Sequence, residues 1–463
     1  MTQKDLGPRV TRWVALGLLL LTWDTASADM ASVAPQPSIT DNLPKDSAAL
    51  VARRWLEERG VTFGLVHTFD LMSNVTGGIR RGTVGGGKLE GMIGIDLEKL
   101  AGVEGLSFYA NAFQLHGNNG PGRNLVGNLN TISNIEALPT TRLSEAWLEQ
   151  SLFGGKGSIR AGQLVVDTEF LFSQYFSFFI SSDWPTNPAV NIPSGGPAYP
   201  LSTPGVRFKL DPTPQTTFLL AVFNGDPAGQ CGADDPEKCN RYGLNFRVND
   251  PPFVISEVQY RYNQDAKAKD PAGGIRLGGW HHFGRFNDLR FDIDGLSLAN
   301  PLSNGIARQF RGNSGIYAVY DQQLYRPAGA DANSGVLWFT RVAYSPPDRS
   351  LVDLYVDGGL IFSKMIASRP DDAFGASFLY SHISKRARGL DLDTRLFTGL
   401  LVPLRDYELS IDISYSASIM PGWTLEPNLQ LIVHPGGNIP LPGSKTQAIG
   451  NATIIGVRST IKY

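Results

Sequence analysis

Residues 142–163 carry charged and aromatic side chains whose spacing favours the binding of a polar solute. Glu145, Trp147 and Glu149 occupy alternate positions before a short glycine-rich turn, and Arg160 follows that turn. Residues two apart lie on the same face of a β-strand, so Glu149 and Arg160 are expected to be near neighbours across a hairpin. Carboxylate groups accept hydrogen bonds and guanidinium groups donate them, while an indole ring offers a flat face on which a solute can stack. This is the chemistry of recognition rather than of bond cleavage.

Three motifs that resemble catalytic or metal sites do not meet the requirements of those sites. The GTVGGGK sequence at 82–88 has the glycine spacing of a phosphate-binding loop, but leucine follows where that loop needs serine or threonine. We expect an external loop there. His281 and His282 are adjacent, so on a strand they face opposite ways and cannot easily hold one metal ion together. Asp371-Asp372 is expected to serve a turn. No Ser/His/Asp constellation stands out, so we expect neither an enzyme nor a cofactor nor a metal site.

The length, composition and charge of the chain narrow the class of protein. The 463 residues include 51 glycines, carry a formal net charge of -2, and are 18% charged and 42% hydrophobic. The near-zero net charge excludes a strongly basic nucleic-acid binder. No apolar run reaches the roughly 20 residues that a spanning helix needs. A large β-protein, soluble or in a membrane, fits this composition.

Alternation of apolar and polar residues predicts strands that span a membrane. From Tyr407 to Tyr415 every second residue is apolar, and Glu408 and Asp412 lie between them. A period of two gives the strand one apolar and one polar face, and a tilted strand of this length approaches the ~25 Å apolar band of an outer-membrane barrel. The alternative is a soluble β-sandwich with one wet face per strand. The number of such segments, and the carboxylates on their polar faces, favour the barrel.

Sixteen such segments predict one all-β domain, a 16-stranded antiparallel transmembrane β-barrel with a short N-terminal helix. A seventeenth candidate, 243–248, is left out because it breaks the alternation of short turns and long loops. The longest loop, 167–201, holds many aromatic rings that would be costly in water, so we expect it to fold into the lumen as a constriction. Alternatively, it packs on the wall as ordinary core. The expected strands begin near residues 61, 89, 104, 141, 156, 202, 215, 253, 273, 312, 334, 350, 373, 406, 421 and 451.

The residues before the barrel are expected to direct export and to flank the membrane. Basic residues precede an apolar run at 13–21, and Ala26-Ser27-Ala28 follows it. This order is typical of a secretory signal peptide, here residues 1–28. Residues 29–60 are then a periplasmic segment with a helix at 47–59, and the barrel takes residues 61–463.

Cys231 and Cys239 are the two cysteines of the chain. They lie eight residues apart in a Gly/Asp/Pro-rich segment. An exported chain meets an oxidising compartment, so we expect a disulfide between them. Two cysteines without a nearby histidine cannot fill a zinc site.

Seven motifs spread over most of the chain resemble those of a known family. They are WLEERGV at 55–61, GIDLEKLAGVEG at 94–105, RLSEAWLEQSLF at 142–153, SIRAGQLVVDTEF at 158–170, YDQQLYR at 320–326, RPDDAFG at 369–375, and the run from YELSIDISYS to LIVHPGG at 407–437. In this order they resemble the carbohydrate-selective porins of the OprB type. The resemblance runs from about Trp55 to Tyr463.

The resemblance implies a barrel in the outer membrane of a Gram-negative bacterium. Glucose and similar monosaccharides would diffuse passively through its water-filled lumen. Its partners would be these sugars, the outer-membrane lipid and the assembly machinery, but no nucleic acid. The chain ends in Tyr463 where such barrels most often end in phenylalanine, and an aromatic residue there still suits the assembly machinery.

The resemblance also gives the polar inner wall a role. Trp147, Glu149 and Arg160 are predicted to form a track for sugars. Mixed charge signs favour neutral polar solutes, and binding has to be weak enough for release. Alternatively, luminal charges pair with one another and stiffen the wall. The predicted pore-lining residues are Glu145, Trp147, Glu149, Arg160, Trp184, Arg341, Asp353 and Glu408, and further inward charges are Asp357, Asp412, Glu426 and Arg458.

Other functions stay open from the sequence. A general porin without selectivity is the nearest alternative, followed by an outer-membrane barrel enzyme and a secreted soluble protein that binds carbohydrate. The sequence also leaves open whether the barrel is single or trimeric. It does not decide whether the helix at 47–59 plugs the periplasmic mouth or lies beside it.

Overall fold

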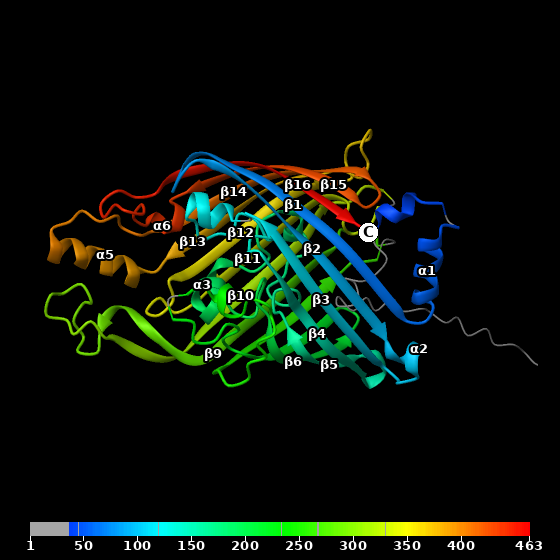
Figure 1. Cartoon of the computed structure of the whole chain (residues 1–463), viewed down its shortest axis with the longest axis horizontal. Helices are drawn as coiled ribbons and strands as arrows, with labels where there is room; N and C mark the ends of the chain where they lie inside the picture. The colour runs from blue at the N-terminus through cyan, green and yellow to red at the C-terminus, as the bar shows by residue number, and fades with distance from the viewer. Residues whose placement is uncertain (1–36, 45, 119, 233, 266–267, 329) are drawn as a thin grey trace, which may run out of the picture.

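Sixteen antiparallel strands close into a single barrel. The computed structural model describes residues 37–463 apart from 45, 119, 233, 266–267 and 329, so the predicted signal peptide lies outside the described residues. Consecutive strands pair with each other, and β1 (Val61–Gly78) also pairs with β16 (Gly450–Lys462), which closes the sheet (Figure 1). The prediction of a 16-stranded antiparallel barrel with an N-terminal helix is confirmed.

Strands make up the wall, and helices are confined to the N-terminal segment and the connections. The other strands are β2 (Gly82–Asp96), β3 (Leu106–Gly117), β4 (Thr140–Leu152), β5 (Gly157–Leu164), β6 (Thr203–Thr213), β7 (Thr216–Asn224), β8 (Pro252–Tyr262), β9 (Gly273–Asp292), β10 (Ala307–Tyr325), β11 (Gly335–Tyr344), β12 (Val352–Ser363), β13 (Ala373–Ile383), β14 (Tyr407–Met420) and β15 (Trp423–Val433). The α-helices are α1 (Ala48–Glu57), α2 (Leu97–Ala101), α3 (Thr186–Asn191), α4 (Pro236–Cys239), α5 (Lys385–Thr398) and α6 (Pro435–Asn438). A π-helical turn lies at Gly122–Val126, and 3₁₀ turns lie at Ile39–Asn42, Phe153–Gly155, Phe176–Phe178 and Pro193–Gly195. Among the described residues, no helix combines the length and the apolar character needed to cross a bilayer.

The barrel wall has its polar side chains inside and its apolar side chains outside. In β14, Glu408 and Asp412 are buried while Leu409 and Ile411 between them are partly exposed. The same inversion recurs around the wall, where large apolar residues are the exposed ones. Examples of these exposed outward side chains are Phe218, Leu220, Val222, Leu277, Ile316, Leu360, Phe362, Phe374, Phe378 and Ile455. An apolar exterior around a polar interior is the arrangement of a barrel surrounded by lipid.

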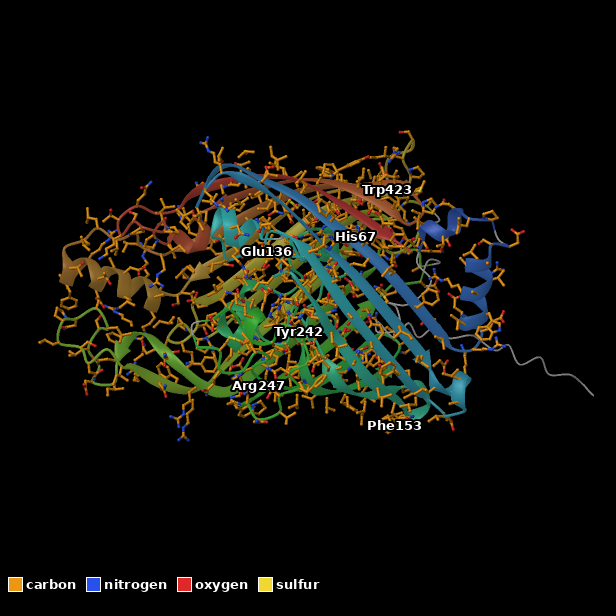
Figure 2. The ribbon with its side chains drawn as sticks, viewed as in Figure 1. His67, Glu136, Phe153, Tyr242, Arg247 and Trp423 are labelled. Carbon is orange, nitrogen blue, oxygen red and sulfur yellow. A yellow bond between two sulfur atoms is a disulfide. The ribbon has the colours of Figure 1, made fainter. Side chains whose placement is uncertain are left out.

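The two ends of the barrel carry different connections. The end with the chain terminus, α1 and α2 has short turns, whereas α5 and α6 lie at the opposite end (Figure 1). Phe153 and Trp423 lie toward the short-turn end, and Glu136 lies toward the long loops (Figure 2). This asymmetry matches the expected alternation of short and long connections.

Two hairpins extend beyond the expected strands. The segment 82–88, expected as an external loop, is the first half of β2, and that prediction is wrong. Glycine usually weakens a strand, but here the absence of a side chain at Gly87 makes room for the imidazole ring of His116. A Cβ atom added to Gly87 would lie 2.6 Å from His116 Nε2. The second extended hairpin joins β9 and β10, and it replaces much of the expected loop 285–311. Both extensions lack the apolar alternation that marks a lipid-facing strand.

The seventeenth candidate strand, 243–248, lies outside the sheet, as expected. The backbone N–H of Leu143 donates to the carbonyl oxygen of Tyr242 at 3.0 Å, so the segment runs past the end of β4. Tyr242, Leu244, Phe246 and Val248 are all more than half exposed, and Tyr242 and Arg247 are labelled in Figure 2. The alternation therefore marks outward apolar side chains rather than strand pairing.

Candidate functional site

The inner wall brings the predicted pair Glu149 and Arg160 together. The two residues face each other in the register of β4 and β5, and Arg160 Nη2 lies 2.6 Å from Glu149 Oε2. The expectation that they are neighbours across the hairpin is confirmed. A bulge in β4 next to Asn111 leaves both Ser144 and Glu145 buried, so Glu145 keeps its inward direction.

Two further residues complete a cluster of four charges. Arg207 of β6 pairs with Arg160 in the register, and its Nη2 is 3.2 Å from Glu149 Oε1. Glu169 comes from the loop after β5, and its Oε2 lies 2.9 Å from Arg207 Nε and 3.7 Å from Arg160 Nη1. We call Glu149, Arg160, Glu169 and Arg207 the charge quartet. The negative charges of its two carboxylates balance the positive charges of its two guanidinium groups, and this pairing offsets the free-energy cost of burying them.

Trp147 supports the charge quartet from behind. The guanidinium carbon of Arg160 lies 3.7 Å from the centre of the Trp147 ring, and that ring stacks on Tyr109 at 5.0 Å. Trp147 is only 2% exposed. The ring face that was expected to meet a solute is therefore covered by a guanidinium group in this structure.

The loop between β5 and β6, residues 165–202, lies inside the barrel. Its Phe176 packs edge-on against Phe339 of β11 at 5.5 Å between ring centres. Arg341 of the same strand donates from Nη1 to the carbonyl oxygens of Leu171 at 3.1 Å and Asp183 at 2.6 Å. Aromatic packing and wall-to-backbone hydrogen bonds thus fix loop 165–202 against the inner wall.

A second loop, 118–139, is also anchored inside. Glu408 accepts hydrogen bonds from the backbone N–H groups of Leu129 at 2.7 Å, Asn130 at 2.6 Å and Gly436 at 2.7 Å. Ser133 of the same loop donates to Asp70 at 2.6 Å. The carboxylate of Glu408 therefore holds loops in place.

The remaining predicted pore-lining residues also serve the wall and the loops. Arg341 and Asp357 form a fully buried ion pair with Nη2 2.6 Å from Oδ2. Asp353 lies 2.6 Å from His382 Nδ1, and Trp184 donates from Nε1 to the carbonyl oxygen of Gly195 at 3.0 Å. None of these four residues lines the cavities described below. The alternative interpretation, wall-stiffening pairs, describes Arg341 and Asp357 well.

Three cavities follow one another along loop 165–202. The central cavity, of about 390 Å³, shares Asn134, Ser182 and Tyr199 with an outer cavity of about 310 Å³. It shares Thr168 and Phe172 with an inner cavity of about 160 Å³. The outer cavity is lined by loop 118–139 and the inner one by residues next to the short turn after β6. The shared linings place the cavities in series between the two ends of the barrel.

The central and inner cavities are lined by different sets of charged side chains. The central cavity is lined by two cations and four carboxylates, and the inner one by three cations and one carboxylate. Lys88 Nζ lies 2.9 Å from Glu90 Oε2 and 4.6 Å from the centre of the Phe113 ring. The charged lining residues are Lys88, Glu90, Glu145, Asp167, Asp183 and Arg458 in the centre, and Glu169, Lys209, Arg261 and Arg276 in the inner cavity. Neither sign dominates the whole series, which suits neutral polar solutes.

Sequence reasoning placed Glu145 and Arg458 on the inner wall but missed most of the other charges of this lining. Lys88 was hidden by the expected loop at 82–88, and Glu90, in the strand expected from residue 89, was not singled out. Asp167, Glu169 and Phe172 belong to a loop, where no period reports which way a side chain points. Arg207 alternates with outward Val206 and Phe208, so the period of two could have identified it.

Besides its contacts with the inner wall, loop 118–139 forms ion pairs with the segment that bears the two cysteines. Arg123 Nη1 lies 2.6 Å from Asp235 Oδ2, and its Nη2 lies 2.6 Å from Glu237 Oε1. Cys231 and Cys239 form a disulfide that closes the same segment. Within the described residues, no group of three or more His, Cys, Asp or Glu side chains is placed to hold a metal ion.

Similar proteins point to one family. Residues 85–463 match the family described as "Carbohydrate-selective porin, OprB family". Porin B of Pseudomonas aeruginosa is 23% identical over 430 residues, which cover 88% of each chain. The high-pH structure of Pseudomonas putida OprB has a TM-score of 0.77 at 21% identity and covers 89% of this chain and 96% of that one. The low-pH structure of the same protein has a TM-score of 0.53 at 14% identity, with 93% and 100% covered.

Glu136 makes loop 118–139 sensitive to pH. Loss of solvation inside the loop raises the pKa of Glu136 to about 7, against the opposing effect of hydrogen bonds from the N–H groups of Gly122 and Arg123. Because the pKa of this carboxyl is higher in the folded loop than in the unfolded one, the folded loop becomes less stable as the pH rises from about 4.5 to about 7. Hydrogen exchange in loop 118–139, corrected for intrinsic rates, should be faster at pH 8 than at pH 5, on the order of tenfold or more. Glu136→Gln should abolish that difference, and an unchanged difference in this variant would contradict the assignment.

Proposed function

The chain belongs to the carbohydrate-selective OprB family of porins, and on that premise we propose that glucose and similar monosaccharides diffuse passively through the three cavities beside loop 165–202. As a member of this family the protein is a channel of the Gram-negative outer membrane, not an enzyme. An N-terminal signal peptide cut after Ala28 would export it. Loop 165–202 then acts as the constriction.

The observation that carries the proposal is the position of two aromatic rings at the cavity junctions. Tyr199 lines the outer and central cavities, and Phe172 lines the central and inner ones. The C–H face of a sugar packs on such rings while its hydroxyls face polar groups. Lys88 Nζ lies 5.4 Å from the centre of the Tyr199 ring, and the guanidinium carbon of Arg276 lies 5.5 Å from that of Phe172. Both contacts are looser than the 3.7 Å contact that covers Trp147, so we infer that a sugar can still pack on these rings at both transfers.

Carboxylates on either side of Phe172 are proposed to receive the hydroxyl groups. Glu145 lines the central cavity and Glu169 lines the inner one. Arg160 and Arg207 pair with Glu149 and Glu169 and hold them in place, and Trp147 supports Arg160. In this proposal the predicted track of Trp147, Glu149 and Arg160 positions the groups that touch the sugar.

Weak binding is part of the proposal. The four charges of the quartet cancel, so a monovalent ion gains little by stopping there, whereas the hydroxyls of a neutral polyol can still form hydrogen bonds with Glu145 and Glu169. A solute that bound tightly would not leave the inner cavity. The resulting transport follows the concentration gradient and needs no energy source.

Liposome swelling tests carbohydrate selectivity. Proteoliposomes of the full chain should swell several-fold faster in D-glucose than in a neutral amino acid of similar size. The sugar hydroxyls can replace their hydrogen bonds to water with hydrogen bonds to Glu145 and Glu169, and the amino acid lacks these hydroxyls. Equal rates for both solutes would leave the general porin as the better description. Empty liposomes give the background rate.

The charge quartet can be tested through the ion current. Glu149→Gln removes one negative charge and leaves Glu169 as the one carboxylate of the quartet, so Arg160 and Arg207 compete with the sugar for it. Glucose should then block the current less well, by roughly tenfold in affinity, which corresponds to the loss of about 1.4 kcal/mol. Selectivity should shift toward anions. The control Glu104→Gln removes the same charge from an exposed turn and should change neither property. An unchanged block in Glu149→Gln would remove the quartet from the sugar path.

A further inference from the structure

An apolar groove of about 590 Å³ lies outside the barrel, between helix α1 and the outer wall of the first strands. Of its lining residues, Asn111 alone also lines one of the three cavities of the lumen. Its lining includes Leu50 of α1, the outward residues Phe63, Leu65 and Ile93, and the terminal Tyr463. Polar groups are sparse around it.

The groove exists because its floor is made of small residues. Leu65, Gly91 and Ala112 face one another in the register of β1, β2 and β3, and Ile93 faces Ala110 in the next row. Elsewhere on the wall the outward positions carry large side chains, as along β7. The wall is therefore recessed beside α1.

Helix α1 lies against the first residues of β1, at the short-turn end of the barrel, and buries none of its own residues. Arg53 lines the groove, with its guanidinium carbon 5.8 Å from the centre of the Phe63 ring. Val51 and Trp55, one turn apart, are 52% and 53% exposed, and the guanidinium carbon of Arg59 lies 4.0 Å from the centre of the Trp55 ring. So much apolar surface on a helix at the rim of a barrel is typical of a helix that lies in a membrane interface.

The charges of the helix complement an anionic head group. From residue 48 to 59 the chain carries Arg53, Arg54 and Arg59 against Glu57 and Glu58. Glu57 is met by Arg53 Nε at 3.0 Å. Arg54 follows Leu50 by one turn, so it lies on the side of the helix that borders the groove. Arginine pairs with phosphate through two parallel hydrogen bonds, and tryptophan prefers the head-group level.

We propose that this groove binds one membrane phospholipid. One acyl chain occupies the groove over Gly91 and Ala112, and the phosphate lies against Arg53 and Arg54. Val51 and Trp55 enter the same leaflet. An acyl chain needs no hydrogen bonds, whereas a protein partner forms about one for every 100–200 Å² of interface, and the groove offers few. The proposal rests on the place of the barrel in the outer membrane and not on its sugar selectivity.

Native mass spectrometry of the full chain tests the site. After incubation with palmitoyl-oleoyl phosphatidylglycerol and delipidation, the wild-type chain should retain one lipid, with at least tenfold more retained than of the phosphate-free diacylglycerol. Gly91→Phe should fill the groove and cut retention by about tenfold, because a Cβ there meets only Leu65 Cδ1 at 3.9 Å and the fold can accept it. The matched control Leu220→Phe, on the far wall, should retain the lipid.

A second variant keeps the test decisive if Gly91→Phe does not fold. Arg53→Gln with Arg54→Gln should lower phosphatidylglycerol retention toward that of diacylglycerol and leave glucose entry unchanged. Trp55→Phe should reduce the part of the tryptophan fluorescence that brominated phosphatidylglycerol quenches, and leave the part that comes from lipid-facing Trp338. Wild-type retention in both groove variants, or a mass of two protein chains without lipid, would overturn the proposal, the latter because a second copy then covers the groove.

Discussion

The absence of hydrogen-bond partners in a hydrocarbon layer is the constraint on which the structure depends. Every backbone N–H and C=O in the wall has to be paired, so the sheet closes where β1 meets β16. At this seam Arg458 Nε lies 2.7 Å from Asp70 Oδ1, which adds an ion pair to the closing register. Once the sheet is closed, a strand period of two sends apolar side chains to the lipid and polar ones inward.

The polar interior then determines where the loops lie. Charges enclosed in the barrel are costly unless they are paired, and the described wall pairs several of them with loop backbone. Arg341 holds loop 165–202, and Glu408 holds loop 118–139. The proposed solute route is the space that these two anchored loops leave open. The wall charges therefore act on solutes mainly through the loops they position.

The sequence predicted the wall much better than the site. Alternation such as that of Tyr407–Tyr415 placed fourteen of the sixteen strand starts within two residues of those observed. The short turn after β4 was enough to predict the contact between Glu149 and Arg160. The remaining charges of the quartet were missed for different reasons. Arg207 carries the period of two, whereas Glu169 lies in a loop whose direction depends on tertiary packing. Lys88 was missed because a run of glycines in a sequence predicts a loop, and the sequence does not show that the His116 ring packs over Gly87.

The position of a bound sugar tests the central claim most directly. Crystals grown with a methyl selenoglucoside would show the ligand by anomalous scattering. The account predicts a selenium peak beside loop 165–202, with the sugar ring packed on Tyr199 or Phe172 and hydroxyl oxygens about 3 Å from Glu145 or Glu169. A sugar bound only in the outer loops, with the three cavities empty at saturating concentration, would contradict it.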